Sequence, residues 1–214
     1  MTTNVGQDRK QLDQAPDAVS TGAGIHVVAK PTGPLCNLNC EYCFYLEKQA
    51  LFDPGEQYRM SDEVLSAFIT NYITSQPTPV VEFVWHGGEP TLLGSDFFRK
   101  VVELQRPFHG RKEIRNALQT NGMRLTDEWC TFFKEHNFLI GLSVDGPEEI
   151  HDTYRLNKGG QGTFDQVIRG WEFLRKYNVD FNILCTLNAA NADHPLEVYH
   201  FFRDEIKAEF IQFI

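Results

Sequence analysis

Short apolar runs alternate with helix-like segments from Ile25 to the end of the chain. The run from Val80 to Trp85 is one example, and its length suits a strand that is buried on both faces. Four later runs have the same character. We therefore expect strands near Ile25 and at 80–85, 114–119, 138–144, 179–187 and 209–214.

The segments between these runs carry apolar residues at helical spacing. The apolar residues of 64–72 fall on one helical face, and we expect Ser61 to cap the amino end of that helix. Thr163 and Gln166 have the spacing of a capping box at a later helix. Further helices are expected after Ser95, after Thr126 and from Pro195.

Alternation of strands and helices indicates an α/β fold with a parallel sheet. It suits either a doubly wound sheet or a barrel, and a complete (β/α)8 barrel takes about 250 residues. The chain of 214 residues stops inside the sixth expected strand, so we expect a truncated domain. Residues 1–24 are poor in apolar residues and are expected to form a mobile tail, which leaves one domain at 25–214.

Composition and charge narrow the function. The formal net charge of -9 argues against a nucleic-acid surface and against an anionic membrane surface. The sequence has no apolar run long enough to cross a bilayer and no secretory signal, so we expect a cytoplasmic protein. Disulfides are not expected in that reducing compartment. Cys130 and Cys185 lie in apolar segments and are expected to be buried core residues.

The other three cysteines, Cys36, Cys40 and Cys43, have the spacing C-x3-C-x2-C. Thiolates this close in sequence can converge on one centre in a loop, and soft thiolates select zinc or iron–sulfur clusters. A structural zinc site takes four ligands, and no other cysteine or histidine has the paired spacing of a zinc finger. A cubane with three cysteine ligands leaves one iron open to a small molecule. The spacing therefore favours a [4Fe–4S] cluster, with a zinc module as the alternative.

Polar loops follow the second and third expected strands. Gly87 and Gly88 allow a ligand to approach the backbone closely, and Glu89 can accept a hydrogen bond from an ammonium group. A plain strand-to-helix turn is the alternative for these residues. Asn121 lies in a similar turn after the third strand, where a binding role and a structural role are both open.

The fourth strand is followed by Ser143 and, twelve residues later, by Arg155. An arginine can hold a carboxylate through two hydrogen bonds, and a serine can add a third. An ion pair within the protein is the alternative for Arg155. All these loops lie where strands lead into helices, so we expect them on the face where α/β barrels place their active sites.

The cysteine triplet, with Tyr42 just before its last cysteine, resembles the signature of the radical S-adenosylmethionine (radical SAM) superfamily. The segment Gly87–Pro90 resembles the GGEP motif of that superfamily, and 120–122 resembles its TNG turn. This resemblance implies a partial (β/α)6 TIM-like barrel of parallel strands with outer helices, truncated in the sixth strand. It also implies a [4Fe–4S] cluster whose open iron binds SAM. It assigns Cys36, Cys40 and Cys43 to the cluster, and Tyr42, Gly87, Gly88, Glu89, Asn121, Ser143 and Arg155 to SAM, with Glu89 on the amino group and Arg155 on the carboxylate.

Longer stretches are similar to the anaerobic sulfatase-maturating enzymes, namely 34–45, 83–91, 118–122, 143–155 and 163–173. The resemblance implies oxidation of a cysteine or serine of a sulfatase polypeptide to Cα-formylglycine, with a reduced electron donor such as flavodoxin or ferredoxin. Members of that family carry a C-terminal SPASM domain with further cysteines, which this chain lacks, so we expect the catalytic base to lie beyond Ile214. Another SPASM-type radical SAM enzyme that modifies a different peptide is the second interpretation, and a non-enzymatic zinc-binding module is the third.

Overall fold

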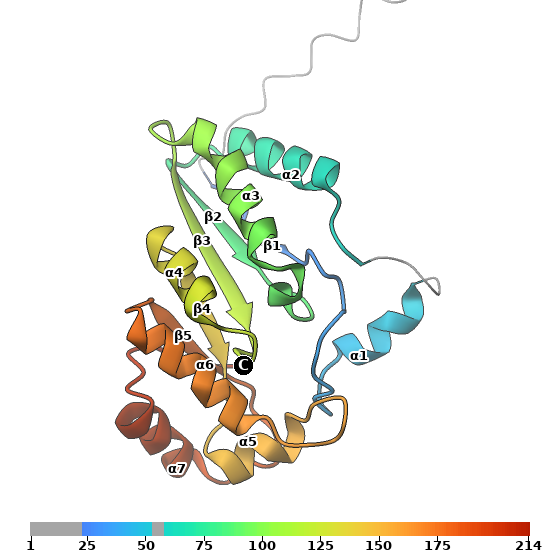
Figure 1. Ribbon diagram of the computed structural model, residues 1–214, viewed down its shortest axis with the longest axis vertical. Helices are drawn as coiled ribbons and strands as arrows, with labels where there is room; N and C mark the ends of the chain where they lie inside the picture. The colour runs from blue at the N-terminus through green and yellow to red at the C-terminus, as the bar shows by residue number, and fades with distance from the viewer. Residues whose placement is uncertain (1–22, 53–57) are drawn as a thin grey trace, which may run out of the picture.

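The computed structural model describes residues 23–52 and 58–214, and the expected tail at 1–24 lies outside these ranges apart from residues 23 and 24. The described residues form a six-stranded parallel sheet with helices between successive strands (Figure 1). The strands are β1 (Val27–Ala29), β2 (Val80–Trp85), β3 (Glu113–Thr120), β4 (Leu139–Ser143), β5 (Phe181–Cys185) and β6 (Ile211–Phe213).

Strand order decides between the two folds that the alternation allowed. Each strand pairs in parallel with the next strand in sequence, so the order is β1-β2-β3-β4-β5-β6. A doubly wound sheet changes direction at a switch point, whereas a barrel adds each strand on the same side of the last. The sheet is therefore part of a TIM-like barrel, as the resemblance implied.

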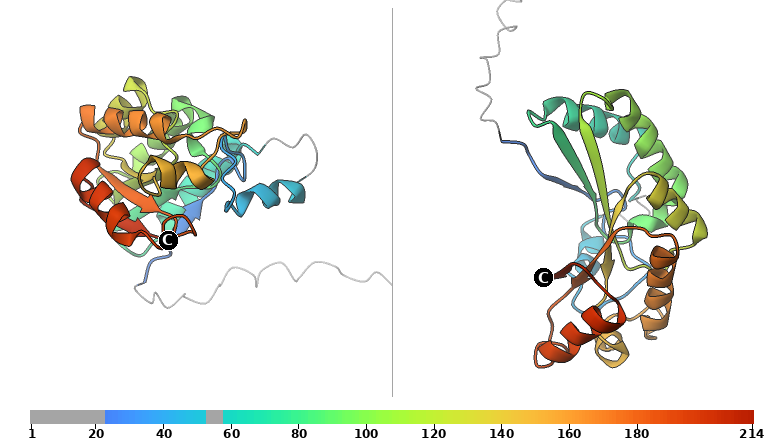
Figure 2. Two further views of the ribbon diagram at one scale, coloured as in Figure 1. Left: turned by 90° about the horizontal axis from the view of Figure 1, so that it is seen from below. Right: turned by 90° about the vertical axis from the view of Figure 1, so that its left-hand side faces the viewer.

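The longer helices α2, α3, α4 and α6 lie along one face of the curved sheet (Figure 2). A short helix α5 was not expected from the sequence. No helix among the described residues has the length and apolar character of a membrane span. The helical elements are α1 (Tyr45–Lys48), η1 (Gln49–Leu51), α2 (Asp62–Ser75), η2 (Pro90–Leu93), α3 (Ser95–Gln105), η3 (Arg106–Phe108), α4 (Asp127–Glu135), α5 (Glu148–Tyr154), α6 (Phe164–Lys176), α7 (Pro195–His200) and the π-helical η4 (Phe201–Glu205).

Helix capping follows the sequence at one expected position and departs from it at another. Ser61 Oγ accepts from the backbone N–H of Val64 at 3.3 Å, which confirms the expected cap of α2. The capping box at Thr163 is wrong, because Thr163 Oγ1 donates to the carbonyl of Arg155 at 2.7 Å. Asp152 instead accepts from the first N–H groups of this turn. The Thr163 hydroxyl therefore binds the carboxyl end of α5, whereas the sequence pattern predicted that it would cap the amino end of α6.

Aromatic side chains fill the space between the sheet and helices α2, α3 and α4. Trp85 of β2 is fully buried, stacks on Phe83, and meets the ring of Phe98 from α3 edge-on. Its indole N–H donates to Asn116 Oδ1 at 2.9 Å, so the polar end of the ring is satisfied inside the core. This packing gives a rigid base to the loops at the carboxyl ends of the strands.

Candidate active site

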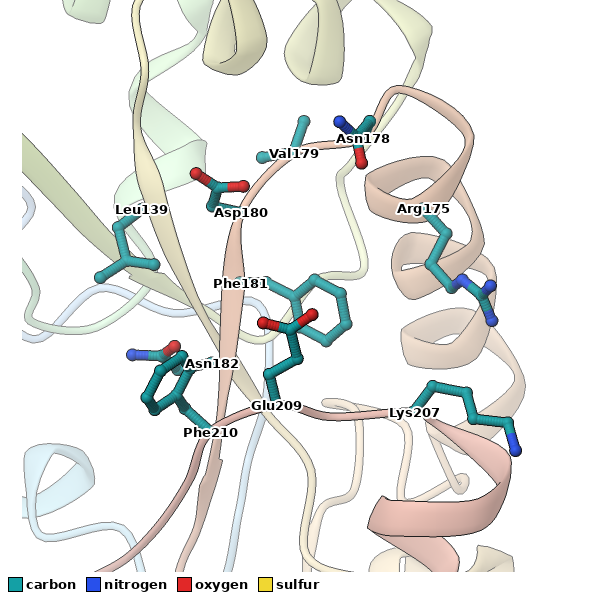
Figure 3. Close-up of a pocket in the computed structure, with 10 residues that line it drawn as sticks. All are labelled: Leu139, Arg175, Asn178, Val179, Asp180, Phe181, Asn182, Lys207, Glu209 and Phe210. Carbon is teal, nitrogen blue, oxygen red and sulfur yellow. The ribbon is translucent and has the colours of Figure 1, made fainter.

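Among the cavities of the described residues, two lie at opposite ends of the strands. The larger of the two, about 820 Å³, lies at the amino ends of β4 and β5 and is also bordered by Lys207, Glu209 and Phe210 (Figure 3). Its charged residues do not converge, because the ends of Arg175 and Lys207 point away from the strands. None of the residues predicted to be functional lines it. The amino ends of barrel strands are also the face that supports stability more often than catalysis.

The smaller cavity, about 320 Å³, lies at the carboxyl ends of the strands. It is built from the loops after β1, β2 and β3, the last residue of β4, and residues after α5 and β5. The backbone alone therefore brings together segments that are far apart in sequence. All ten predicted site residues line this cavity: Cys36, Cys40, Tyr42, Cys43, Gly87, Gly88, Glu89, Asn121, Ser143 and Arg155.

The cysteine loop is held in place from outside. The backbone N–H of Asn39 donates to the carbonyl of Leu156 at 2.8 Å, and that of Glu41 donates to the carbonyl of Tyr154 at 3.1 Å. The backbone N–H of Leu38 donates to Cys36 Sγ at 3.4 Å. Burial raises the pKa of the Cys36 thiol to about 12 and that of Cys40 to about 11. Thiolates in this loop therefore need a compensating positive centre.

A [4Fe–4S] cluster and a single metal ion place different demands on the thiols of this loop. Within residues 23–52 and 58–214, no three His, Cys, Asp or Glu side chains are grouped as ligands of one metal ion. Each cysteine of a cubane binds a different iron, so its ligands need not meet at one point. Cys130 and Cys185 are buried away from the cavity, which confirms the prediction that they are core residues.

Gly88 has a structural role that differs from the expected one. Its backbone N–H donates to the carbonyl of Gly33 at 2.9 Å, and the N–H of Glu89 donates to the carbonyl of Leu35 at 2.8 Å. A Cβ on Gly88 would lie 2.0 Å from that Leu35 oxygen. The close backbone approach predicted for this position is thus made to the segment just before Cys36. Gly87 is in the left-handed region with a φ of 113°, which favours glycine there.

Glu89 joins two loops through a buried carboxylate. Its Oε1 accepts from the N–H and hydroxyl of Thr91 at 3.0 and 2.6 Å and from the hydroxyl of Thr120 at 2.8 Å. Its Oε2 accepts one bond, at 2.8 Å, from the backbone N–H of Asn121. Burial raises the pKa of Glu89. No cationic side chain in the described ranges pairs with it, so an ammonium ligand at Oε2 would compensate this charge.

Asn121 connects the loop after β3 to the cysteine loop. Its Nδ2 donates to Asn37 Oδ1 at 2.9 Å, and its Oδ1 accepts from the backbone N–H of Met123 at 3.1 Å. The side chain therefore bridges two loops and closes its own turn. These bonds give Asn121 the structural role that was the alternative, and its side chain also lines the cavity.

Arg155 pairs with a residue that the motif did not single out. Its Nε and Nη2 donate to the two carboxylate oxygens of Asp145 at 2.9 and 3.0 Å, and both side chains are buried. The ion pair considered as the alternative for Arg155 is therefore real. Nη1 has no acceptor among the residues that the structure describes, and Arg155 lines the cavity. Ser143 Oγ likewise takes part in no hydrogen bond within the described residues.

Tyr42 and His151 complete the surroundings of this ion pair. The Tyr42 hydroxyl donates to Asp145 Oδ2, and the guanidinium carbon of Arg155 lies 5.6 Å from the centre of the Tyr42 ring. His151 Nδ1 accepts from the backbone N–H of Asp145 at 3.3 Å. Burial lowers the pKa of His151 to about 3, so the ring is neutral. The sequence analysis did not identify Asp145 or His151 as site residues, although both lie within 143–155. The available signal for Asp145 was an acidic residue directly before a Gly-Pro turn at the end of a strand.

Comparison with known proteins agrees with these features. The model of the radical SAM superfamily matches residues 31–202. A serine-type anaerobic sulfatase-maturating enzyme of Bacteroides thetaiotaomicron is 48% identical over 189 residues, covering 88% of this chain and 45% of the relative. A cysteine-type enzyme of Clostridium perfringens is 40% identical over 192 residues, covering 89% of this chain and 51% of the relative.

A solved structure of anSMEcpe with bound AdoMet and Cp18Cys peptide superposes with a TM-score of 0.79 at 40% identity. The match covers 87% of this chain and 49% of that one. The chain thus spans about half the length of the relatives it matches. With the family model covering most of its residues, the chain belongs to the radical SAM superfamily, whose members use a [4Fe–4S] cluster and S-adenosylmethionine.

Proposed function

We propose that this protein cleaves SAM reductively and uses the product to oxidise a cysteine or serine of a sulfatase polypeptide to Cα-formylglycine. The observation that carries the proposal is one shared cavity at the carboxyl ends of the strands, lined by three cysteines, a buried carboxylate and a buried guanidinium. Among the described residues, Glu89 Oε2 accepts a single hydrogen bond, and neither Nη1 of Arg155 nor Oγ of Ser143 makes one. These groups match the ammonium and carboxylate of an amino-acid ligand.

Cys36, Cys40 and Cys43 would hold the [4Fe–4S] cluster. When bound, the cluster supplies the electron that splits SAM into methionine and a 5′-deoxyadenosyl radical. Glu89 would bind the amino group of SAM through Oε2. Ser143 and Nη1 of Arg155 would bind its carboxylate.

The other assigned residues shape the cavity. The glycine pair, Gly87 and Gly88, keeps the loop after β2 against the segment that precedes the cluster ligands. Asn121 bridges to Asn37 of the cysteine loop, and the Tyr42 ring forms part of the wall. These contacts fix the walls of the cavity that would hold SAM.

The sulfatase substrate is supported by the relatives named as serine-type and cysteine-type sulfatase-maturating enzymes. A reduced flavodoxin or ferredoxin would supply the electron, because a cluster of this kind takes a low-potential donor. We infer a cytoplasmic location from the same chemistry, since a reducing compartment keeps the ligand thiols free. All five cysteines, which lie within the described ranges, are unpaired thiols.

The test is anaerobic reconstitution of the full protein with iron and sulfide, followed by reduction in the presence of SAM and a peptide with the sulfatase Cys or Ser motif. We expect about four irons from the cluster at Cys36, Cys40 and Cys43, together with 5′-deoxyadenosine and a peptide aldehyde that reacts with a hydrazine probe. Cys40→Ala should lose these irons, the 5′-deoxyadenosine and the aldehyde, while Cys130→Ala, which alters a cysteine outside the cavity, should keep all three.

Three results separate the alternatives. SAM cleavage without aldehyde would reject sulfatase maturation and leave another radical SAM peptide modification. One zinc per chain with no SAM cleavage would reject the cluster altogether. Equal iron content in the Cys40→Ala variant and the wild type would reject the ligand assignment.

A further inference from the structure

Asp145 lies at the meeting point of four segments that are distant in sequence. It follows β4, and its side chain is 1% exposed. Its Oδ2 accepts from the Tyr42 hydroxyl of the cysteine loop at 2.5 Å and from Arg155 Nε at 2.9 Å. Its Oδ1 accepts from Arg155 Nη2 at 3.0 Å and from the backbone N–H of Thr186 after β5 at 2.9 Å. Both oxygens are thus filled by donors from outside the β4 loop.

Asp145 does not itself line the cavity, but all three of its side-chain partners do. The Asp145 carboxylate therefore holds three residues of the cavity wall in place from the side opposite the cavity, namely Tyr42, Arg155 and Thr186. Asp145 is thus in hydrogen-bond contact with the cavity lining through these three partners.

The backbone around Asp145 is fixed as firmly as its side chain. Its N–H donates to His151, and its carbonyl accepts from Asn191 Nδ2 at 3.2 Å. The carbonyl of Arg155 accepts from the hydroxyl of Thr163 at 2.7 Å. Neither end of the Asp145–Arg155 pair can therefore turn without breaking a second set of bonds.

The ion pair leaves a defined part of the guanidinium unused. Asp145 occupies Nε and one terminal nitrogen, which leaves Nη1 without an acceptor in the described part of the chain. An arginine side chain has many rotamers, and an unpaired buried charge would drive it toward water. With Asp145 in place the guanidinium plane is held in one orientation, with the ring of Tyr42 5.6 Å away.

We propose that Asp145 is a positioning residue for the ligand in the cavity: it fixes Arg155 and Tyr42 so that Nη1 and the aromatic ring meet SAM in one geometry. The inference rests on the proposed function, because it takes SAM as the occupant. A residue that only supported the fold would leave SAM affinity unchanged in variants that fold and assemble the cluster.

The experiment compares Asp145→Asn with Asp152→Asn in the full reconstituted protein. Asparagine keeps the shape of aspartate but turns one acceptor into a donor that faces other donors. Asp152 is the control, because it accepts backbone N–H bonds from Thr163 and Phe164 but does not line the cavity and makes no side-chain hydrogen bond to Tyr42 or Arg155 within the described residues. Iron and sulfide per chain, SAM affinity by equilibrium dialysis, and the EPR spectrum of the reduced cluster with and without SAM are measured for each.

We expect both variants to assemble the cluster. The SAM dissociation constant of Asp145→Asn should rise about tenfold to a hundredfold, the range for loss of charge-assisted bonds, while Asp152→Asn changes it less than about twofold. The change of the EPR spectrum on SAM addition should be lost or weakened only in Asp145→Asn. Combined with Arg155→Lys, the substitution should add less than its full single effect, because the part that acts through the guanidinium is already lost.

A dissociation constant for Asp145→Asn equal to that of the wild type, at equal iron content, would overturn the inference and leave the proposed function standing. A wild type that binds no SAM would overturn both. If Asp145→Asn does not fold, Tyr42→Phe takes its place, since it keeps the ring and removes one donor. It should raise the SAM dissociation constant about twofold to tenfold, and an unchanged value would refute the inference.

Discussion

Replacing Gly88 by alanine should push the loop after β2 away from the loop that carries Cys36, Cys40 and Cys43. The new Cβ would lie 2.0 Å from the carbonyl oxygen and 2.5 Å from the carbonyl carbon of Leu35, whereas ordinary contacts begin at 3.4 Å. Both obstacles are backbone atoms, so no side chain can rotate away. Because the φ of Gly88 is not in the left-handed region, the cost comes from this contact and not from backbone conformation.

The magnitude follows from what the separation breaks. The hydrogen bonds from Gly88 N–H to Gly33 and from Glu89 N–H to Leu35 would both be lost or stretched. At about 1 kcal/mol for each bond and about 1–3 kcal/mol for overpacking, the free energy of unfolding should fall by about 3–5 kcal/mol. Leu35 directly precedes Cys36, so cluster assembly should fail in the same variant.

The matched control is Gly110→Ala. Gly110 has a φ of 86°, and a Cβ there would meet nothing within 4 Å. Its cost is therefore limited to the left-handed conformation, about 1–2 kcal/mol. Urea denaturation followed by circular dichroism gives both values, and iron per chain after reconstitution gives the second readout. Equal destabilisation of the two variants, or full iron content in Gly88→Ala, would refute this reasoning.

Three further outcomes are expected. Cys36→Ala and Cys43→Ala should each abolish cluster assembly but keep the far-ultraviolet circular dichroism of the wild type; a full complement of iron and sulfide in either would contradict the ligand assignment. Burial lowers the pKa of His151 to about 3 in the folded protein, whereas in the unfolded chain this histidine takes up a proton below about pH 6.5. The free energy of unfolding should therefore fall by up to about 1.4 kcal/mol for each pH unit below that value. His151→Gln should show a shallower loss between pH 7 and 5, and parallel curves would count against it. Phe98→Ala, at a fully buried ring, should cost about 3–5 kcal/mol in the same assay, and exposed Leu196→Ala within about 0.5 kcal/mol; similar values for the two would argue against the packing of α3.

The secondary structure was largely predictable because its causes are local. The strand expected at 80–85 is observed as Val80–Trp85, and the helix after Ser61 begins at Asp62. Strand ends elsewhere differ by a residue or two from the apolar runs, since hydrogen bonding to the neighbouring strand sets where pairing stops. Helix α5 was missed because seven residues give too short a pattern for periodicity to detect.

The cavity residues were predictable as a set, whereas their contacts were not. The ten residues that the motifs singled out all line the cavity, because most of these motifs follow the carboxyl end of a strand in a parallel sheet. The partner of Arg155 could not be predicted from the sequence, since a guanidinium binds any carboxylate that the fold brings near. The approach of Gly88 to Leu35 was equally hidden, because 52 residues intervene and only packing brings the two backbones together.

The sequence by itself was enough to predict the alternation of strands and helices, the cluster ligands and the resemblance to the radical SAM superfamily. All three depend on residue type and on short spacings along the chain. Only the tertiary structure decided that the strands follow one another as in a barrel, that Glu89 braces two loops, and that Asp145 supports Arg155 and Tyr42 from behind. The physical reason is that a hydrogen bond between side chains requires a defined distance and angle between donor and acceptor. At this site, the relative positions of four strand ends set those distances and angles.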